Sequence, residues 1–284
     1  LEREGQASAA VVPMRAGDTV GDANTAGASL APGRWSASNL EQLRAFAATE
    51  RQRAGDDGSR RVAVFDADGT LWHEDIGEAF LKRLFAERQL VDYDYRRDVF
   101  AEYEARCAVD TTAGYGFCAQ VMAGMDERRL DQLAAAFYAE FREHRIPEMS
   151  ELVRLLRALG IEVWIVSASN RWLVRQSAAD YGVPPERVLA IHTRVVDGRL
   201  TDELIEPVTN LAGKAQAIEH WIGVDPLFAA GNSANDWQML ERATTIRLVI
   251  NPNATLRERI ESEWGRAPAS PPGPRVLTQD FAAE

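Results

Sequence analysis

The chain has 284 residues, of which 46% are hydrophobic and 26% charged, as in an ordinary globular protein. This length can hold one large domain, or a core with a sizeable insertion. The formal net charge of −11 argues against a nucleic-acid partner, because an acidic surface would repel its phosphates. No apolar run approaches the roughly 18 residues that a membrane-spanning helix needs, so we expect no membrane span.

The N-terminal stretch has the composition of a flexible leader. Residues 1–37 are rich in Ala, Gly, Ser and Thr and lack a convincing apolar core. Such a leader could follow a removed signal, or it could be a terminus with no targeting meaning. A cytoplasmic and an exported location therefore both stay open. A helical pattern then begins at Ser38 and runs to about Arg53.

Residues 60–72 contain the first candidate catalytic residues. Their apolar run 62–65, Val-Ala-Val-Phe, has the pattern of a strand that a parallel sheet buries on both faces. Asp66 and Asp68 follow directly, and the carboxyl end of a strand is where open α/β sheets bind ligands. One carboxylate could attack a substrate while the other handles protons, and Mg²⁺ could hold both against their repulsion. The simpler interpretation is an Asp-Gly turn after a strand.

The interval 77–146 shows helical spacing and no strand signal, and we predict that it forms an α-helical cap inserted after the first strand. Its helical patterns run over about 94–107, 115–125 and 128–143. Cys107 and Cys118, the only two cysteines of the chain, lie in this interval. They could form a disulfide or remain free thiols, because sequence spacing does not give the distance between them.

After the cap, strand and helix patterns alternate. This alternation predicts an α/β core over residues 38–76 and 147–284, built on a doubly wound parallel sheet. Asp197-Gly198 is a strong β-hairpin signal. We expect the segment after Gly265 to be a loose closing tail. Strands are predicted at 161–166, 188–196, 199–204, 226–230 and 246–250, and helices at 148–159, 170–181 and 210–222.

Four short motifs resemble those of the haloacid dehalogenase superfamily, in its phosphatase branch. Residues 65–71, Phe-Asp-Ala-Asp-Gly-Thr-Leu, resemble motif I, and residues 164–169, Trp-Ile-Val-Ser-Ala-Ser, resemble motif II. Lys214 resembles motif III, and residues 230–239, Ala-Gly-Asn-Ser-Ala-Asn-Asp-Trp-Gln-Met, resemble motif IV. Together they cover about residues 61–250, and the arrangement is similar to phosphoserine phosphatases and their phosphocholine-hydrolysing relatives. The resemblance implies a Rossmann-like core with the four motifs along one edge.

The resemblance assigns catalytic roles to the two aspartates of motif I. Asp66 would be the nucleophile, and its attack on phosphorus would give an aspartyl-phosphate. Asp68 would protonate the leaving alkoxide and then deprotonate the attacking water. Thr70 would help to hold the loop, or would only cap the next helix. Phosphate binding falls to groups of the later motifs, namely those of Ser167, Ala168, Lys214 and Asn235.

The resemblance also implies a Mg²⁺ cofactor, held through Asp66, Asp68, Asn232 and Asp236. For Asp68 the ligand would be the backbone carbonyl. Motif IV departs from the phosphoserine phosphatase pattern, because Asn232 stands where that pattern has a directly ligating aspartate. An amide oxygen can bind Mg²⁺ but brings no charge, so metal affinity should be lower. Either Asn232 or Asp236 could be the direct ligand.

The expected partner is a small phosphomonoester. Asp75 and Glu78 follow motif I, where the phosphoserine phosphatase pattern places an acid near the substrate amine, although either could be a first-turn helix residue. The stretch 115–122 has no basic residue where that pattern carries an arginine; Arg97 and Arg106 lie earlier and could substitute, although exposed helix faces suit them as well. Acids without an arginine favour phosphocholine or phosphoethanolamine over phosphoserine. Some aromatic residues could add cation–π contacts, the candidates being Trp72, Tyr93, Tyr95, Tyr103, Tyr115 and Phe117.

Three other activities are weighed against this one. C–halogen hydrolysis is disfavoured, because relatives with that activity lack the second motif I aspartate, here Asp68. Phosphoryl transfer to a sugar hydroxyl stays open, since the sequence does not show which acceptor is used. A non-catalytic phosphate-binding module is motivated by Asn232. The oligomeric state is open as well.

Overall fold

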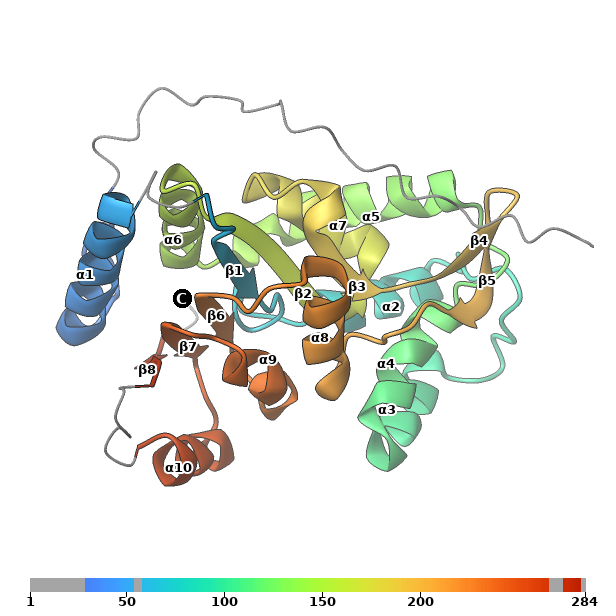
Figure 1. Ribbon diagram of the computed structural model, residues 1–284. Helices are drawn as coiled ribbons and strands as arrows, with labels where there is room; N and C mark the ends of the chain where they lie inside the picture. Colours follow the sequence, from blue (N-terminus) through green and yellow to red (C-terminus); the bar gives the residue numbers. More distant parts are fainter. Residues whose placement is uncertain (1–28, 54–57, 266–272, 282–284) are drawn as a thin grey trace, which may run out of the picture.

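A six-stranded parallel sheet lies at the centre of the computed structural model, which describes residues 29–53, 58–265 and 273–281 (Figure 1). Its strands run in the order β3-β2-β1-β6-β7-β8, and every neighbouring pair is parallel. The strands are β1 (Val62–Phe65), β2 (Glu162–Asn170), β3 (Val188–Ile191), β6 (Phe228–Gly231), β7 (Ile246–Ile250) and β8 (Arg275–Gln279). The predicted doubly wound parallel sheet is confirmed, and its topological switch point lies between β1 and β6.

Alternate residues of the strands enter two separate apolar cores. In β1, Ala63 and Phe65 belong to one core, and Val62 and Val64 to the other. The first core includes the helices α1 (Ala37–Arg53), α6 (Pro147–Ala158) and α7 (Arg171–Asp180). The second includes the π-helical turn Ile218–Ile222 that continues α8 (Ala212–Ala217), together with α9 (Trp237–Glu241) and α10 (Ala254–Glu263). Burial on both faces explains why the sequence of β1 is an unbroken apolar run.

Of the α-helices between β1 and β2, the four that precede α6 lie in the interval for which a cap is predicted. They are α2 (Ile76–Ala86), α3 (Val99–Val109), α4 (Thr111–Gln120) and α5 (Glu127–Phe141). Each begins after an aspartate whose carboxylate accepts a hydrogen bond from a backbone N–H of the first turn, which explains these four starts. Cys107 and Cys118 are free thiols. Within the described ranges, no helix has the length and apolar character that crossing a membrane requires.

The predicted hairpin is present, but it does not extend the sheet. Strands β4 (Thr193–Val196) and β5 (Arg199–Leu204) pair antiparallel around Asp197 and Gly198, both with positive φ as a tight hairpin turn requires. The single strand expected over 188–196 is therefore two strands, of which only β3 joins the sheet. The hairpin instead bonds to the segment between α4 and α5, where the backbone of Leu200 exchanges hydrogen bonds with Gly124 and Met125 at 2.8 and 3.0 Å.

The expectation of a loose tail after Gly265 is wrong for residues 273–281. Helix α10 ends at Glu263, before this tail, but within the tail Arg275–Gln279 forms β8, the strand that ends the sheet beside β7. The residues 266–272 between them lie outside the described part of the chain. Only two of the five residues of β8 are buried, so its sequence has no continuous apolar run that would predict a strand.

The expected leader is also too long at its C-terminal end. Leu30 and Trp35 are buried in the first apolar core, and Arg34 forms an ion pair of 2.9 Å with Glu148 of α6. The side chain of Gln279 accepts a hydrogen bond from the backbone of Ser36, so β8 and this segment hold each other. Such contacts join residues far apart in sequence and leave no local pattern. Residues 1–28 lie outside the described residues.

Candidate active site

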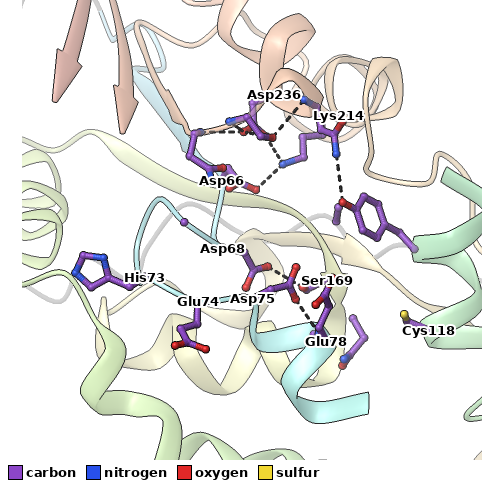
Figure 2. Close-up of a pocket in the computed structure, with 18 of the residues that line it drawn as sticks. Asp66, Asp68, His73, Glu74, Asp75, Glu78, Cys118, Ser169, Lys214 and Asp236 are labelled. Carbon is purple, nitrogen blue, oxygen red and sulfur yellow. Dashed lines mark hydrogen bonds and ion pairs between the residues drawn. The ribbon is translucent and has the colours of Figure 1, made fainter. Parts of the chain in front are cut away.

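The carboxyl ends of β1, β2 and β6 open into a pocket of about 240 Å³ beside the switch point of the sheet (Figure 2). All four sequence motifs reach this pocket, as the motif order implied. They contribute Asp66, Asp68, Gly69, Ala168, Ser169, Lys214, Asn232, Ser233, Asn235 and Asp236. The segment between β1 and β2 contributes His73, Glu74, Asp75, Gly77, Glu78, Tyr103, Tyr115 and Cys118. The pocket therefore lies between the strand ends and the inserted helices.

Asp66 is a buried carboxylate held from two sides. Its Oδ1 accepts a hydrogen bond from Nζ of Lys214 at 2.5 Å, and its Oδ2 accepts one from the hydroxyl of Thr70 at 3.1 Å. Its backbone N–H donates to the carbonyl of Ala230 in β6 at 2.8 Å, so the residue is fixed at the switch point. Burial and the nearby carboxylate of Asp236 raise the pKa of Asp66 to about 7, although Lys214 opposes the shift.

Lys214 is buried between two carboxylates. Its Nζ lies 2.5 Å from Oδ1 of Asp66 and 2.6 Å from Oδ1 of Asp236. Burial by itself would lower the pKa of Lys214, but these two carboxylates outweigh it and raise the pKa above the ordinary value. The other oxygen of Asp236 accepts hydrogen bonds from the N–H groups of Asn232 and Ser233 at 3.0 and 2.9 Å and from the hydroxyl of Ser233 at 3.1 Å. Both oxygens of Asp236 are therefore occupied.

Asp68 is held separately from Lys214. Its Oδ1 accepts hydrogen bonds from Nε1 of Trp72 at 2.8 Å and from the backbone N–H of Ile76 at 2.7 Å. Its Oδ2 accepts one from the hydroxyl of Ser169 at 2.7 Å, and Figure 2 shows Asp68 and Ser169 side by side. Burial raises the pKa of Asp68, and the three hydrogen bonds limit the rise. The carboxyl group is thus fixed in orientation and favours its protonated form more than a solvated aspartate.

Two residues that fix Asp68 were missed as site residues in the sequence. Ser169 is named above only as part of motif II; α7 is capped by the next residue, Asn170, whose side chain accepts a hydrogen bond from the N–H of Leu173. Trp72 was grouped with the aromatic residues that could bind a cation, but it is fully buried and donates its N–H to Asp68. In the sequence, the second serine of the Ser-Ala-Ser run was the feature that could have indicated a hydroxyl group at the site.

Ser167 lies behind the pocket. It is fully buried and does not line the pocket, whereas Ala168 and Ser169 do. Its hydroxyl accepts a hydrogen bond from the N–H of Ser169 at 3.0 Å, and its carbonyl accepts one from the hydroxyl of Thr209 at 2.5 Å. Ser167 therefore shapes the backbone that faces the pocket, and a direct phosphate contact by its hydroxyl stays a prediction.

Residues of motifs I and IV that carry oxygen atoms suited to a metal ion line the same pocket. Gly69 has a φ of +70°, and a Cβ added there would lie 2.0 Å from Nδ2 of Asn232, so the amide of Asn232 lies directly against the motif I turn. Asn232, the carboxylate of Asp66 and the backbone carbonyl of Asp68 offer the hard oxygen ligands that Mg²⁺ prefers. In the described part of the chain, no three His, Cys, Asp or Glu side chains converge as a metal cluster, so a metal ion held here would also use amide or carbonyl oxygens.

Charge also favours a cation at this position. The carboxylates of Asp66, Asp68, Asp75 and Asp236 line one pocket with a single lysine. Burial, and after it the charge of Asp68, raise the pKa of Asp75 well above its ordinary value. A divalent cation would relieve this repulsion, and the residues present therefore fit Mg²⁺.

The far side of the pocket carries acids and tyrosines. Asp75 caps α2 by accepting from the N–H of Glu78 at 2.7 Å, and the carboxylate of Glu78 accepts from the hydroxyl of Tyr103 at 2.9 Å. The hydroxyl of Tyr115 in α4 accepts from the amide of Asn235 in motif IV at 3.4 Å. Burial, and after it Asp75, raise the pKa of Tyr115 to about 12. A helix of the inserted segment thus touches motif IV directly.

Arginine is absent from the described lining of the pocket. Arg97 pairs with Glu102 at 2.6 Å, and the guanidinium of Arg106 lies 4.4 Å from the ring centre of Phe117. Neither Arg97 nor Arg106 therefore lines the pocket, where it could bind a carboxylate of the substrate. Tyr93 and Tyr95 pack against Phe85, and Phe117 is buried, so none of these three aromatic residues lines the pocket either.

Comparison with known proteins shows which proteins this chain is similar to. The family model for haloacid dehalogenase-like hydrolases matches residues 63–241. Phosphoserine phosphatase SerB2 of Mycobacterium tuberculosis is 25% identical over 205 residues, which cover 70% of this chain and 46% of that protein. Phosphorylcholine phosphatase of Pseudomonas aeruginosa is 27% identical, and the match covers 81% of this chain and 86% of that protein. The chain thus spans about half of the first relative and most of the second.

A solved structure supports the fold. A functionally unknown protein from Anaerococcus prevotii superposes with a TM-score of 0.68 at 15% identity, covering 90% of this chain and 99% of that one. At this identity the likeness concerns the fold alone.

Proposed function

The chain belongs to the haloacid dehalogenase-like hydrolase family, and we propose that it is a Mg²⁺-dependent phosphatase that cleaves a small phosphomonoester through an aspartyl-phosphate. The observation that carries this proposal is the pairing of two differently held carboxylates at the switch point. Asp66 is oriented by Lys214 and Thr70, while Asp68 is oriented by Trp72, Ser169 and the start of α2. Such a division suits one nucleophile and one proton carrier.

In the proposed reaction, a carboxylate oxygen of Asp66 attacks phosphorus and the bond to the ester oxygen breaks. Asp68 gives its proton to the leaving alkoxide, then takes a proton from the water that attacks the aspartyl-phosphate and releases phosphate. The hydroxyl of Ser169 can accept as well as donate a hydrogen bond, so Oδ2 of Asp68 keeps its partner in both protonation states. Lys214, Asn235 and the backbone N–H of Ala168 would bind the phosphoryl oxygens.

For the metal, we propose Asp66, the carbonyl of Asp68 and Asn232 as direct ligands. Asp236 is less suited to direct contact, because Lys214 and the motif IV backbone occupy its two oxygens. When bound, Mg²⁺ would supply positive charge beside the phosphoryl group. Asp236 would act on the metal site by holding Lys214 and the motif IV turn.

For the substrate, we propose an amino-alcohol phosphate such as phosphocholine or phosphoethanolamine. Glu78 and Asp75 provide carboxyl groups on the far side of the pocket, and Tyr103 and Tyr115 provide aromatic walls. A quaternary ammonium against a desolvated aromatic face gains on the order of 2 kcal/mol. Since no arginine is among the lining residues described, a substrate carboxylate such as that of phosphoserine would lack a partner. We further propose that residues 77–146 act as a cap over this pocket.

Two assays test the proposal. Release of phosphate from p-nitrophenyl phosphate should require Mg²⁺ and should stop when EDTA is added, whereas phosphate binding without turnover would support the non-catalytic alternative. For the substrate, kcat/KM is compared for phosphocholine, phosphoethanolamine, phosphoserine and glycerol phosphate. If phosphoserine or glycerol phosphate is preferred by about tenfold, the amino-alcohol proposal is wrong while the phosphatase proposal stands.

A further inference from the structure

A second pocket, of about 190 Å³, lies along β3, the outermost strand at one edge of the sheet. In Figure 1, α7 and α8 flank this strand, and both contribute to the pocket. We call it the edge pocket, and its polar and aromatic lining consists of Arg171, Arg175, Glu186, His192, Glu206, Thr209 and Trp221. None of these residues lines the active-site pocket.

Two arginines of the edge pocket form no ion pair with any residue that the structure describes. Arg171 and Arg175 lie one turn apart on α7, and the Nε atoms of both are buried without a hydrogen bond. Burial, and after it the charge of Arg175, lower the pKa of Arg171 to about 10. Glu127 and Asp131 of α5 counter this only from beyond ion-pair distance. Buried donors without acceptors cost free energy that a bound anion would recover.

The rest of the lining suits a ligand with one anionic end. His192 is neutral at pH 7, because burial and Arg171 lower its pKa to about 4, and its Nδ1 donates to the carbonyl of Ala190 at 3.0 Å. The carboxylate of Glu206 already accepts a hydrogen bond from the N–H of Val208 at 2.9 Å. Trp221 is 49% exposed and offers an aromatic surface in the same pocket.

We propose that the edge pocket binds a small organic anion, with a carboxylate, sulfonate or phosphate group on Arg171 and Arg175 and a flat apolar body against Trp221. The charge-assisted hydrogen bonds of two guanidinium groups would supply the specificity for the anionic group. This inference is independent of the proposed activity, because none of its residues takes part in the proposed chemistry.

Thr209 connects the edge pocket to the active site. Its hydroxyl donates to the carbonyl of Ser167 in motif II at 2.5 Å. The next residue, Asn210, donates to the hydroxyls of Thr111 and Thr112 at the start of α4 at 3.1 and 3.0 Å. A ligand in the edge pocket would therefore contact the segment that joins motif II to the helices over the active site.

Isothermal titration of the full chain with benzoate and with benzenesulfonate tests the proposal and separates carboxylate from sulfonate recognition. We expect saturable binding of at least one probe, weakened at least about tenfold by Arg175→Gln, the loss typical for one charged hydrogen bond. Arg175→Lys should lose less. Arg128→Gln is the matched control, because it removes an exposed arginine of α5 outside the pocket and should leave the affinity unchanged.

Two results would overturn the proposal. One is the absence of saturable binding of both probes to the wild-type chain at millimolar concentration. The other is equal affinity in the wild type and in Arg175→Gln, which would place the probe elsewhere. If circular dichroism shows that Arg175→Gln does not fold, Trp221→Ala takes its place, and unchanged affinity in that variant contradicts the proposal equally.

Discussion

The hydroxyl of Ser169 donates a hydrogen bond to Oδ2 of Asp68, with 2.7 Å between the two oxygens. This bond joins the end of β2 to the end of β1, and Gly77 leaves room for it, because a Cβ there would lie 2.6 Å from the Ser169 oxygen. We infer that Ser169 positions the proton carrier of the reaction. The same contact makes the role of Ser169 measurable.

Ser169→Ala should lower kcat for an alkyl phosphate about tenfold with little change in KM, because Asp68 loses one of the hydrogen bonds that orient it. Asp68→Asn sets the scale, with an expected loss of about 10²–10⁴-fold. The loss should be smaller for p-nitrophenyl phosphate, whose leaving group needs little protonation. Ser262→Ala on the exposed side of α10 is the control. Equal losses for both substrates would show that Ser169 does not act through proton transfer.

Asp66→Asn should abolish turnover, because an amide is a poor nucleophile and cannot form the aspartyl-phosphate. Beryllium fluoride, a mimic of the phosphoryl group, should bind the wild-type chain with Mg²⁺ and fail to bind the variant. Activity is followed by phosphate release, with mass spectrometry to exclude deamidation back to aspartate. Retained activity in a verified variant would eliminate Asp66 as the nucleophile.

Lys214→Met should destabilise the chain, because it leaves the buried carboxylates of Asp66 and Asp236 without a counter-charge. Breaking a buried ion pair from one side costs about 3–5 kcal/mol, and urea unfolding in EDTA measures the loss. Mg²⁺ should restore part of it in the variant. Lys82→Met changes the other lysine, which is exposed over the ring of Phe100, and should cost less than about 1 kcal/mol. Equal losses for the two variants would contradict the electrostatic account.

Asn232→Asp should tighten Mg²⁺ binding, since it places a charged oxygen where the amide now lies against the motif I turn. Titration of activity against Mg²⁺ measures the change, with calorimetric titration of the metal as an independent readout. Asn251→Asp, outside the pocket, serves as the control for added charge. Unchanged or weaker affinity would remove Asn232 from the proposed ligand set.

Arg34→Met should weaken the attachment of the N-terminal segment to α6, lowering the free energy of unfolding by about 1–2 kcal/mol at pH 7. Hydrogen bonds from Arg34 hold the pKa of Glu148 below its ordinary value of 4.5. Their stabilisation is therefore complete above pH 4.5 and is lost as the pH falls through the lowered pKa. The difference between wild type and variant in urea unfolding should shrink over that range. Arg96→Met, which breaks an exposed pair, should show a much smaller difference at any pH.

The sequence by itself determined the features that local residue order controls. The apolar run 62–65 followed by Asp66 and Asp68 is a strand with carboxylates at its end, because buried parallel strands need continuous apolar residues and end where polar groups begin. Asp197-Gly198 is a turn because both residues tolerate positive φ. The order of the four motifs implied a shared edge, and they do line one pocket.

Only the tertiary structure decided which of these groups touch. Ser169 and Asp68 are 101 positions apart and Lys214 and Asp66 are 148 apart, so no local pattern reports their hydrogen bonds. Strand β8 was missed because its place depends on pairing with β7 and on the contact of Gln279 with the segment around Ser36, and neither contact leaves a local pattern in residues 275–279. Such contacts form when elements that are far apart in the sequence pack together. The sequence alone does not give the distances between those elements.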